Sequence, residues 1–174
     1  MNIAYTIAPG RGDTDLLLLG FARALTARGL RPIGTVQMST ERPDAGPCDM
    51  DVQVLPDGPV IRISQDLGHA AKGCRLDPDA LETAVGLVHA TLRPGVDCLI
   101  VNKFGKHEAG GRGFRGVIAE AASMGIPILV GLNEMNREPF LDFTGGLGTE
   151  LKPETDALVD WFELQAVEFS DATC

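Results

Sequence analysis

Residues 98–115 read CLIVNKFGKHEAGGRGFR, an apolar run that leads into a loop rich in glycine and basic residues. The run CLIV at residues 98–101 is typical of a strand that is buried on both faces of a parallel sheet. Ligands of open α/β sheets bind beyond the carboxyl ends of such strands. We therefore expect residues 102–115, which follow this strand directly, to lie at a ligand-binding edge.

Strand and helix patterns alternate on both sides of this stretch. Short apolar runs bounded by glycine or proline predict further strands over residues 2–8, 31–38 and 126–132, and the turn PDGP predicts a hairpin of residues 51–55 and 60–64. Apolar residues at helical spacing predict helices over residues 13–28, 77–92, 114–125 and 153–169. This order predicts a single α/β domain over residues 1–174, with an open, mainly parallel sheet, helices on both faces and an antiparallel hairpin.

The formal net charge of −9 is unevenly distributed along the 174 residues. Residues 117–174 carry 2 basic and 11 acidic side chains, whereas residues 60–116 carry 8 basic and 6 acidic ones. An acidic chain without clustered lysine and arginine is atypical of a general nucleic-acid binder. The mildly basic middle segment leaves open a small anionic ligand.

No apolar run approaches the roughly 20 residues that span a bilayer, and residues 1–12 do not have the pattern of a signal peptide. We therefore expect a cytoplasmic protein without membrane insertion. The four cysteines show no CxxC spacing, so the sequence indicates neither a zinc site nor a disulfide framework. It leaves the cofactor unknown and an assembly of identical chains open.

Residues 7–14 read IAPGRGDT and follow the first predicted strand. A phosphate-binding P-loop has the pattern GxxxxGK[ST], in which glycines admit the phosphates, the lysine neutralises their charge and the hydroxyl holds Mg²⁺. Here Gly12 and Thr14 keep their register, whereas Ile7 replaces the first glycine and Asp13 replaces the lysine. Because an ionised Asp13 repels phosphate, we expect this loop not to support Mg²⁺-dependent hydrolysis of nucleoside triphosphates.

This layout resembles the small P-loop enzymes called cancer-related or thermophilic-type nucleoside-triphosphatases, in which a later strand ends in a pattern like IDEIGKME. The matching residues 101–108 read VNKFGKHE. The resemblance implies a P-loop NTPase-like fold, with Asn102 in the place of the Mg²⁺-supporting aspartate and Lys103 in the place of the acid that activates water. Since Asp13 and Lys103 have exchanged the usual charges, we predict an ion pair between them across the former nucleotide site.

The segments RISQDLG, GCRLDP and VNKFGKHEAGGRGFR are more similar still to a bacterial family of unknown function. Genes of that family often lie beside molybdate-transport or nitrogen-fixation genes. The resemblance covers most of residues 1–145, and it implies a link to the handling of molybdate or related oxyanions.

Two polar clusters are the candidate anion-binding groups. In residues 102–115, glycines free the backbone and basic side chains favour an anion; around residues 62–75, arginine suits planar oxyanions and serine adds a hydroxyl. The structural alternatives are a solvated loop, an Arg62 on an exposed hairpin face, and an Arg75 that pairs with Asp77 or Asp79. The candidate ligand-binding residues are Gly10, Gly12, Asp13, Thr14, Arg62, Ser64, Gln65, Lys72, Arg75, Asn102, Lys103, Lys106, Glu108 and Arg112.

The leading hypothesis is an accessory or regulatory protein that binds a small anion, either a molybdate-like oxyanion or a nucleotide, without efficient hydrolysis. One alternative is a divergent nucleoside-triphosphatase or phosphotransferase that uses lysine or arginine of residues 102–115. A second alternative is a protein-interaction module without a small ligand. No residue is assigned a catalytic or metal-ligating role.

Overall fold

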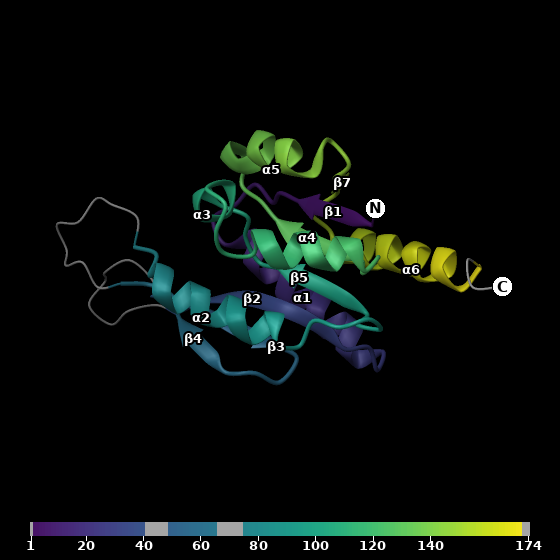
Figure 1. The fold of residues 1–174 in the computed structure, drawn as a ribbon, viewed down its shortest axis with the longest axis horizontal. Coiled ribbons are helices and arrows are strands. Elements are labelled where there is room, and N and C mark those ends of the chain that lie inside the picture. Colours follow the sequence, from purple (N-terminus) through teal and green to yellow (C-terminus); the bar gives the residue numbers. More distant parts are fainter. Residues whose placement is uncertain (1, 41–48, 66–74, 172–174) are drawn as a thin grey trace.

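The computed structural model describes residues 2–40, 49–65 and 75–171, which are arranged around one seven-stranded sheet (Figure 1). The strands are β1 (Ile3–Thr6), β2 (Pro32–Thr40), β3 (Asp49–Leu55), β4 (Val60–Arg62), β5 (Cys98–Val101), β6 (Ile128–Gly131) and β7 (Thr149–Leu151). Their order across the sheet is β4-β3-β2-β5-β6-β1-β7. Strands β2, β5, β6, β1 and β7 pair in parallel, and β3 pairs antiparallel with both β2 and β4. The predicted mainly parallel sheet with an antiparallel hairpin is thereby confirmed.

Helices cover both faces of the sheet. They are α1 (Asp13–Ala27), α2 (Pro78–His89), α3 (Lys106–Ala109), α4 (Arg115–Ser123), α5 (Arg137–Thr144) and α6 (Thr155–Asp171), with a 3₁₀ turn, η1 (Glu134–Asn136), before α5. Apolar side chains of α2, α4 and α5 join one buried cluster, and those of α1 and α6 join another. The sheet therefore separates two apolar layers, as the α/β pattern predicts.

Strand β5 shows why the sequence folds in this way. Leu99 and Val101 point into the layer below α2 and α4, while Cys98 and Ile100 point into the layer below α1. All four side chains are fully buried, and each large apolar one contributes about 1.5–3 kcal/mol on burial. A run without a polar residue is stable only where both faces of the strand are covered.

Residues 133–151, for which the sequence predicts no regular element, contain η1, α5 and β7. Helix α5 has eight residues, and β7 has three, two of them exposed, so neither gives a long apolar period. Phe140 nevertheless anchors α5, because its buried ring packs edge-on against Tyr5 and Phe104 with centroids 5.5 and 5.3 Å apart. Tertiary contacts, and not local periodicity, hold this segment in place.

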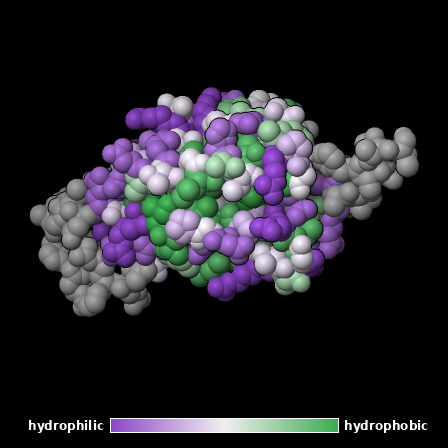
Figure 2. All heavy atoms as spheres, turned by 60° about the horizontal axis from the view of Figure 1, so that its bottom comes forward, coloured by the Kyte–Doolittle hydropathy of each residue, from purple (hydrophilic) through white to green (hydrophobic). Residues whose placement is uncertain are grey.

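Apolar side chains also reach the surface. Large exposed ones are Leu16, Val60, Leu87, Met135, Leu147 and Leu164. Figure 2 shows an apolar area, in green, in the middle of the face turned forward, with hydrophilic residues around it. Among the described residues no helix combines the length and the apolar character that a bilayer crossing requires.

Gly34 permits the close pairing of β2 with β5. Its φ is +119°, and a Cβ at this position would meet the backbone carbonyl of Ile100. We expect Gly34→Ala to lower the free energy of unfolding by about 3 kcal/mol or more, because overpacking adds to backbone strain. Urea denaturation measures this loss.

Gly86 is the matched control, since it lies inside α2 with no atom near its would-be Cβ. Gly86→Ala should raise the free energy of unfolding by about 0.5–1 kcal/mol, because alanine is the better helix former. Equal, small effects of the two substitutions would contradict the strain assigned to Gly34.

Candidate functional site

The middle of β2 and the segments that follow β5 and β6 border a cavity of about 320 Å³. Its apolar wall consists of Met50, Val52, Ile63, Leu76, Leu81, Phe114 and Met135. Its polar lining consists of Thr35, Gln37, Asn102, Lys103, Lys106, His107, Glu108, Asn133 and Asn136. The cavity thus lies at the edge where the parallel sheet is expected to bind a ligand, and on the face that α2 covers.

The segment in the place of a P-loop lies between β1 and α1. Gly12, the N-cap of α1, has a left-handed backbone with φ 84°, and the Ala8 N–H donates to the Thr14 hydroxyl at 3.1 Å. No side chain caps the helix, and its first turn carries the acids Asp13 and Asp15. The partial positive charge at this helix end therefore faces carboxylates of the chain itself.

The predicted ion pair between Asp13 and Lys103 is wrong: within the described part of the chain these two residues do not pair. The Asp13 carboxylate folds back against Gly10, so that a Cβ on Gly10 would collide with it. The acid whose pKa the charge of Lys103 lowers is Asp15, two positions further along α1. The helical rotation of about 200° between these positions turns Asp15 toward the end of β5.

Asp15 belongs to a network that joins α1 to β2 and to the end of β5. It accepts hydrogen bonds from Asn102 Nδ2 at 2.9 Å and from Gln37 Nε2 at 3.2 Å. The Gln37 backbone N–H in turn donates to Asn102 Oδ1 at 2.8 Å. Burial raises the pKa of Asp15, against the opposing effects of the Asn102 hydrogen bond and the Lys103 charge. Both polar atoms of the Asn102 side chain are thereby engaged, which fixes its orientation beside the cavity.

Glu108 closes the loop that follows β5. This carboxylate is 3 % exposed, and it accepts the N–H of Gly105 at 2.8 Å and that of Phe114 at 3.4 Å. Gly113 has φ 58°, and a Cβ there would meet Glu108 Oε1. Glu108 lines the cavity, but it also binds the backbone of its own loop and so holds the segment that carries Lys106.

A second carboxylate, Glu82 of α2, braces the same loop from outside. Glu82 Oε1 accepts the Gly113 N–H at 2.8 Å and lies 2.9 Å from His107 Nε2. These two hydrogen bonds lower the pKa of Glu82. Glu82 could not be predicted from the sequence, because it lies on the polar face of α2 and only its tertiary contacts mark its role.

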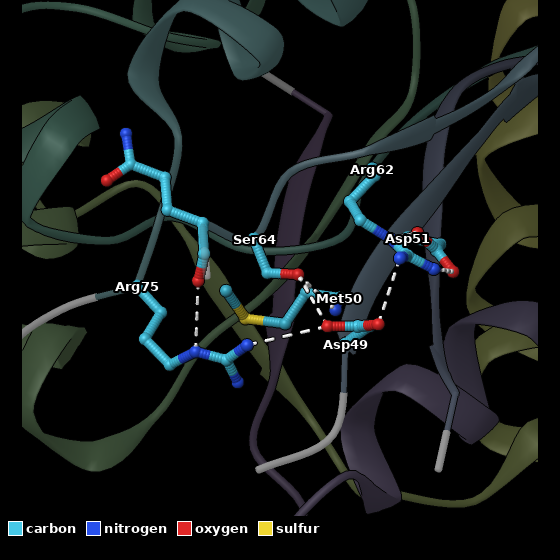
Figure 3. A network of polar contacts seen from close by, with 7 residues as sticks. Asp49, Met50, Asp51, Arg62, Ser64 and Arg75 are labelled. Carbon is cyan, nitrogen blue, oxygen red and sulfur yellow. Dashed lines mark hydrogen bonds and ion pairs between the residues drawn. The ribbon is translucent and has the colours of Figure 1, made fainter. Parts of the chain in front are cut away.

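The second predicted cluster, around residues 62–75, is a network of ion pairs (Figure 3). Arg62 lies 2.9 Å from a carboxylate oxygen of Asp49 and 3.0 Å from one of Asp51, and Arg75 lies 3.4 Å from Asp49. The Ser64 hydroxyl accepts the N–H of Met50 at 3.0 Å. These groups brace the β3–β4 hairpin.

The predicted alternative partners of Arg75, Asp77 and Asp79, are wrong. Asp77 caps α2 by accepting the N–H groups of Asp79 and Ala80. Arg75 reaches Asp49, because Ser64 and Leu76 pair as an isolated antiparallel bridge that brings residue 75 beside the start of β3.

The predicted site residues thus lie at separate places. Those that line the cavity are Asn102, Lys103, Lys106 and Glu108. Those that lie at the start of α1 are Gly10, Gly12, Asp13 and Thr14, and those beside the hairpin are Arg62, Ser64, Gln65 and Arg75. Arg112 lies in the loop before α4, where its charge helps to lower the pKa of Glu82. Lys72 lies outside the described residues.

The family model described as "Protein of unknown function (DUF2478)" matches residues 3–161. A relative named "Molybdenum import ATP-binding protein ModC 2", from Bradyrhizobium diazoefficiens, is 38 % identical over 163 residues, or 92 % of this chain. The chain spans only 18 % of that relative's length. The similarity therefore concerns one segment of a much longer protein.

Two solved structures share the fold. THEP1 from Aquifex aeolicus has a TM-score of 0.63 and 14 % identity, over 94 % of this chain and 95 % of that one. A human cancer-related nucleoside triphosphatase has a TM-score of 0.61 and 16 % identity, over 99 % of this chain and 97 % of that one. At such identities the likeness shows the fold, and it confirms the predicted P-loop NTPase-like architecture.

The brace by Glu82 predicts a pH-dependent stability. Because its pKa is lowered on folding, the ionised Glu82 stabilises the protein above the unfolded-state pKa, and this contribution is lost as the pH falls through the lowered folded-state pKa. At about pH 7, Glu82→Gln should lower the free energy of unfolding by about 0.5–1 kcal/mol, since the side chain is 45 % exposed and water competes for its bonds. The difference should shrink below about pH 4.

Glu120→Gln is the matched control. Glu120 is 43 % exposed and also pairs with a histidine, His89, at 2.7 Å, but it accepts no hydrogen bond from a loop backbone in the described residues. Urea denaturation of the variants at both pH values measures the effects. A loss for Glu82→Gln that is independent of pH, or equal to that of the control, contradicts the brace.

Proposed function

The chain belongs to the DUF2478 protein family, and we propose that it binds a small anion or a nucleotide at the carboxyl edge of its sheet, without efficient hydrolysis. The observation that carries this proposal is the presence of Lys103 and Lys106 in the lining of the cavity that follows β5. Both residues are exposed, so that their ammonium groups are accessible to a ligand from solvent. Lysine donates to phosphate and other oxyanions as a point charge.

The charges at the edge support binding without hydrolysis. Asp13 stands where a P-loop lysine would neutralise phosphate, and the first turn of α1 carries Asp15 as well. Asn102 has both polar side-chain atoms in hydrogen bonds to Asp15 and Gln37, and it carries no charge to support Mg²⁺. At Lys103, an amine stands where the resemblance places the carboxylate that activates water. The two lysines that line the cavity belong to the segment after β5.

The similarity to the molybdenum importer's ATP-binding protein supports a place in molybdate handling. The matching segment belongs to a relative named for molybdenum import, so the shared sequence supports a role in the same process. We propose that this chain is an accessory or regulatory protein of oxyanion import, and that molybdate or a nucleotide occupies its edge. Its role would then be to sense the ligand and not to turn it over.

Ligand binding tests the proposal directly. Thermal-shift and calorimetric titrations of the purified chain with ATP, GTP, AMP, GMP, molybdate, tungstate, sulfate and phosphate should show stabilisation by at least one of these anions. Lys103→Ala and Lys106→Ala should each weaken the binding of that anion about tenfold, which corresponds to about 1.4 kcal/mol for one lost charged contact.

Lys152→Ala is the control, because Lys152 is exposed and lies between β7 and α6, away from the cavity. It should leave the affinity unchanged. If none of the anions stabilises the protein, the proposal is contradicted and the protein-interaction alternative is favoured. Magnesium-dependent phosphate release that Lys103→Ala abolishes would instead establish the divergent nucleoside-triphosphatase or phosphotransferase.

A further inference from the structure

We infer that the cavity binds a nucleoside monophosphate, with its flat nitrogen heterocycle inside and its phosphate at Lys103 and Lys106. The inference rests on the anion-binding function proposed above, and it names the class of ligand. Bare oxyanions such as phosphate and molybdate are the competing ligands. The distinction follows from the groups that line the inner part of the cavity.

Thr35 is the first of these groups. It is 2 % exposed and lines the cavity, yet its hydroxyl has no hydrogen-bond partner among the described residues. Side chains alternate along β2, so Thr35 shares a face with Ile33, which packs toward α2, whereas Val36 packs toward α1. Thr35 Oγ1 is not among the fully buried side-chain atoms without a partner, so it is open to the cavity and can bond a ligand there. It can donate to, or accept from, the edge of a heterocycle.

Asn136 is the second such group. It is 7 % exposed, and its Nδ2 donates to Asn133 Oδ1 at 2.7 Å. The Asn136 N–H donates to the same oxygen at 3.1 Å, so the Asn133 side chain holds the Asn136 amide in place. Within the described residues Asn136 Oδ1 accepts no hydrogen bond, and the residue lines the cavity. An acceptor held in this way suits a ring N–H or an exocyclic amino group.

The remaining wall is apolar and excludes a bare oxyanion from the interior. Met50 and Val52 of β3, with Leu81 of α2 and Phe114, present hydrocarbon and ring surface to the cavity. A hydrated dianion placed there would lose its water without gaining partners, whereas a flat ring would bury apolar surface. The volume of about 320 Å³ lies at the lower end of the range for small-molecule sites, which suits one nucleotide and not two.

The cavity is also separate from the start of α1. Described residues that line it come from β2, β3, the hairpin, α2 and the segments after β5 and β6, and residues 7–14 are not among them. The hydrogen bonds of Asp15 with Asn102 and Gln37 lie between the two places. A ligand in the cavity is thus held by Lys103 and Lys106 and not by the P-loop-like segment.

Thr35→Val tests the inference, because valine keeps the shape and removes the hydroxyl. Without ligand, the variant should be about as stable as the original chain, since within the described residues the Thr35 hydroxyl has no hydrogen bond to lose. Its calorimetric affinity for the nucleoside monophosphate that binds best among AMP, GMP, CMP and UMP should fall about fivefold or more. Its affinity for inorganic phosphate and for molybdate should not change.

Thr6→Val is the matched control. Thr6 is equally buried in the sheet, but its hydroxyl donates to the Leu151 carbonyl at 3.2 Å, and it does not line the cavity. This variant should lower the melting temperature and leave nucleotide affinity unchanged. A purely structural role of Thr35 would give the same pattern for Thr35→Val, and that result overturns the inference.

The outcomes separate this inference from the proposed function. If phosphate or molybdate binds as tightly as every nucleoside monophosphate and depends on Lys103 and Lys106, the edge binds anions but the heterocycle is excluded. If a nucleoside monophosphate binds with an affinity that depends on Thr35 but not on the lysines, binding of the heterocycle in the cavity is supported. The proposed anion site at Lys103 and Lys106 is then contradicted. Binding of none of these ligands overturns both.

Discussion

The burial of β5 on both faces is the constraint on which the rest of the structure depends. Its four apolar residues connect the layer under α2 and α4 to the layer under α1, and they pair with β2 on one side and β6 on the other. Because this strand has no room for a polar group, every polar side chain of the segment lies beyond its carboxyl end. The abrupt change from Val101 to Asn102 therefore places the polar network and the lysines at one edge.

At that edge, acidic and basic side chains lie on different elements. The α1 terminus faces Asp13 and Asp15, whereas the basic residues Lys103 and Lys106 follow β5. Asp15 is partly desolvated, which raises its pKa, but it keeps two side-chain hydrogen bonds that link α1 to β2 and β5. The network thus engages these polar side chains in contacts within the protein, and the neighbouring cavity lies beside it.

Long apolar patterns allowed the strands near the centre of the sheet and the helices α1, α2, α4 and α6 to be predicted, whereas α5 and β7 are too short to show a pattern. The same holds for the site. Lys103 and Lys106 were predicted because they follow a buried strand. Arg62 was predicted as a ligand contact, whereas the observed hairpin register opposes it to Asp51. The predicted turn at residues 56–59 would have opposed it to Gln53, so this pair could not be read from the sequence.

The residues that sequence reasoning missed have roles that depend on contacts between distant elements. Glu82 is an ordinary polar residue of α2 until Gly113 and His107 come within hydrogen-bonding distance. Thr35 has no special mark in the sequence of its strand. Only the folded structure places it in the lining of the cavity with α2 and the loop after β5. Valine would satisfy the strand and the apolar layer better, since local pattern and packing both favour it. The ligand recognition that we propose gives a reason for a threonine at a position where packing alone favours valine.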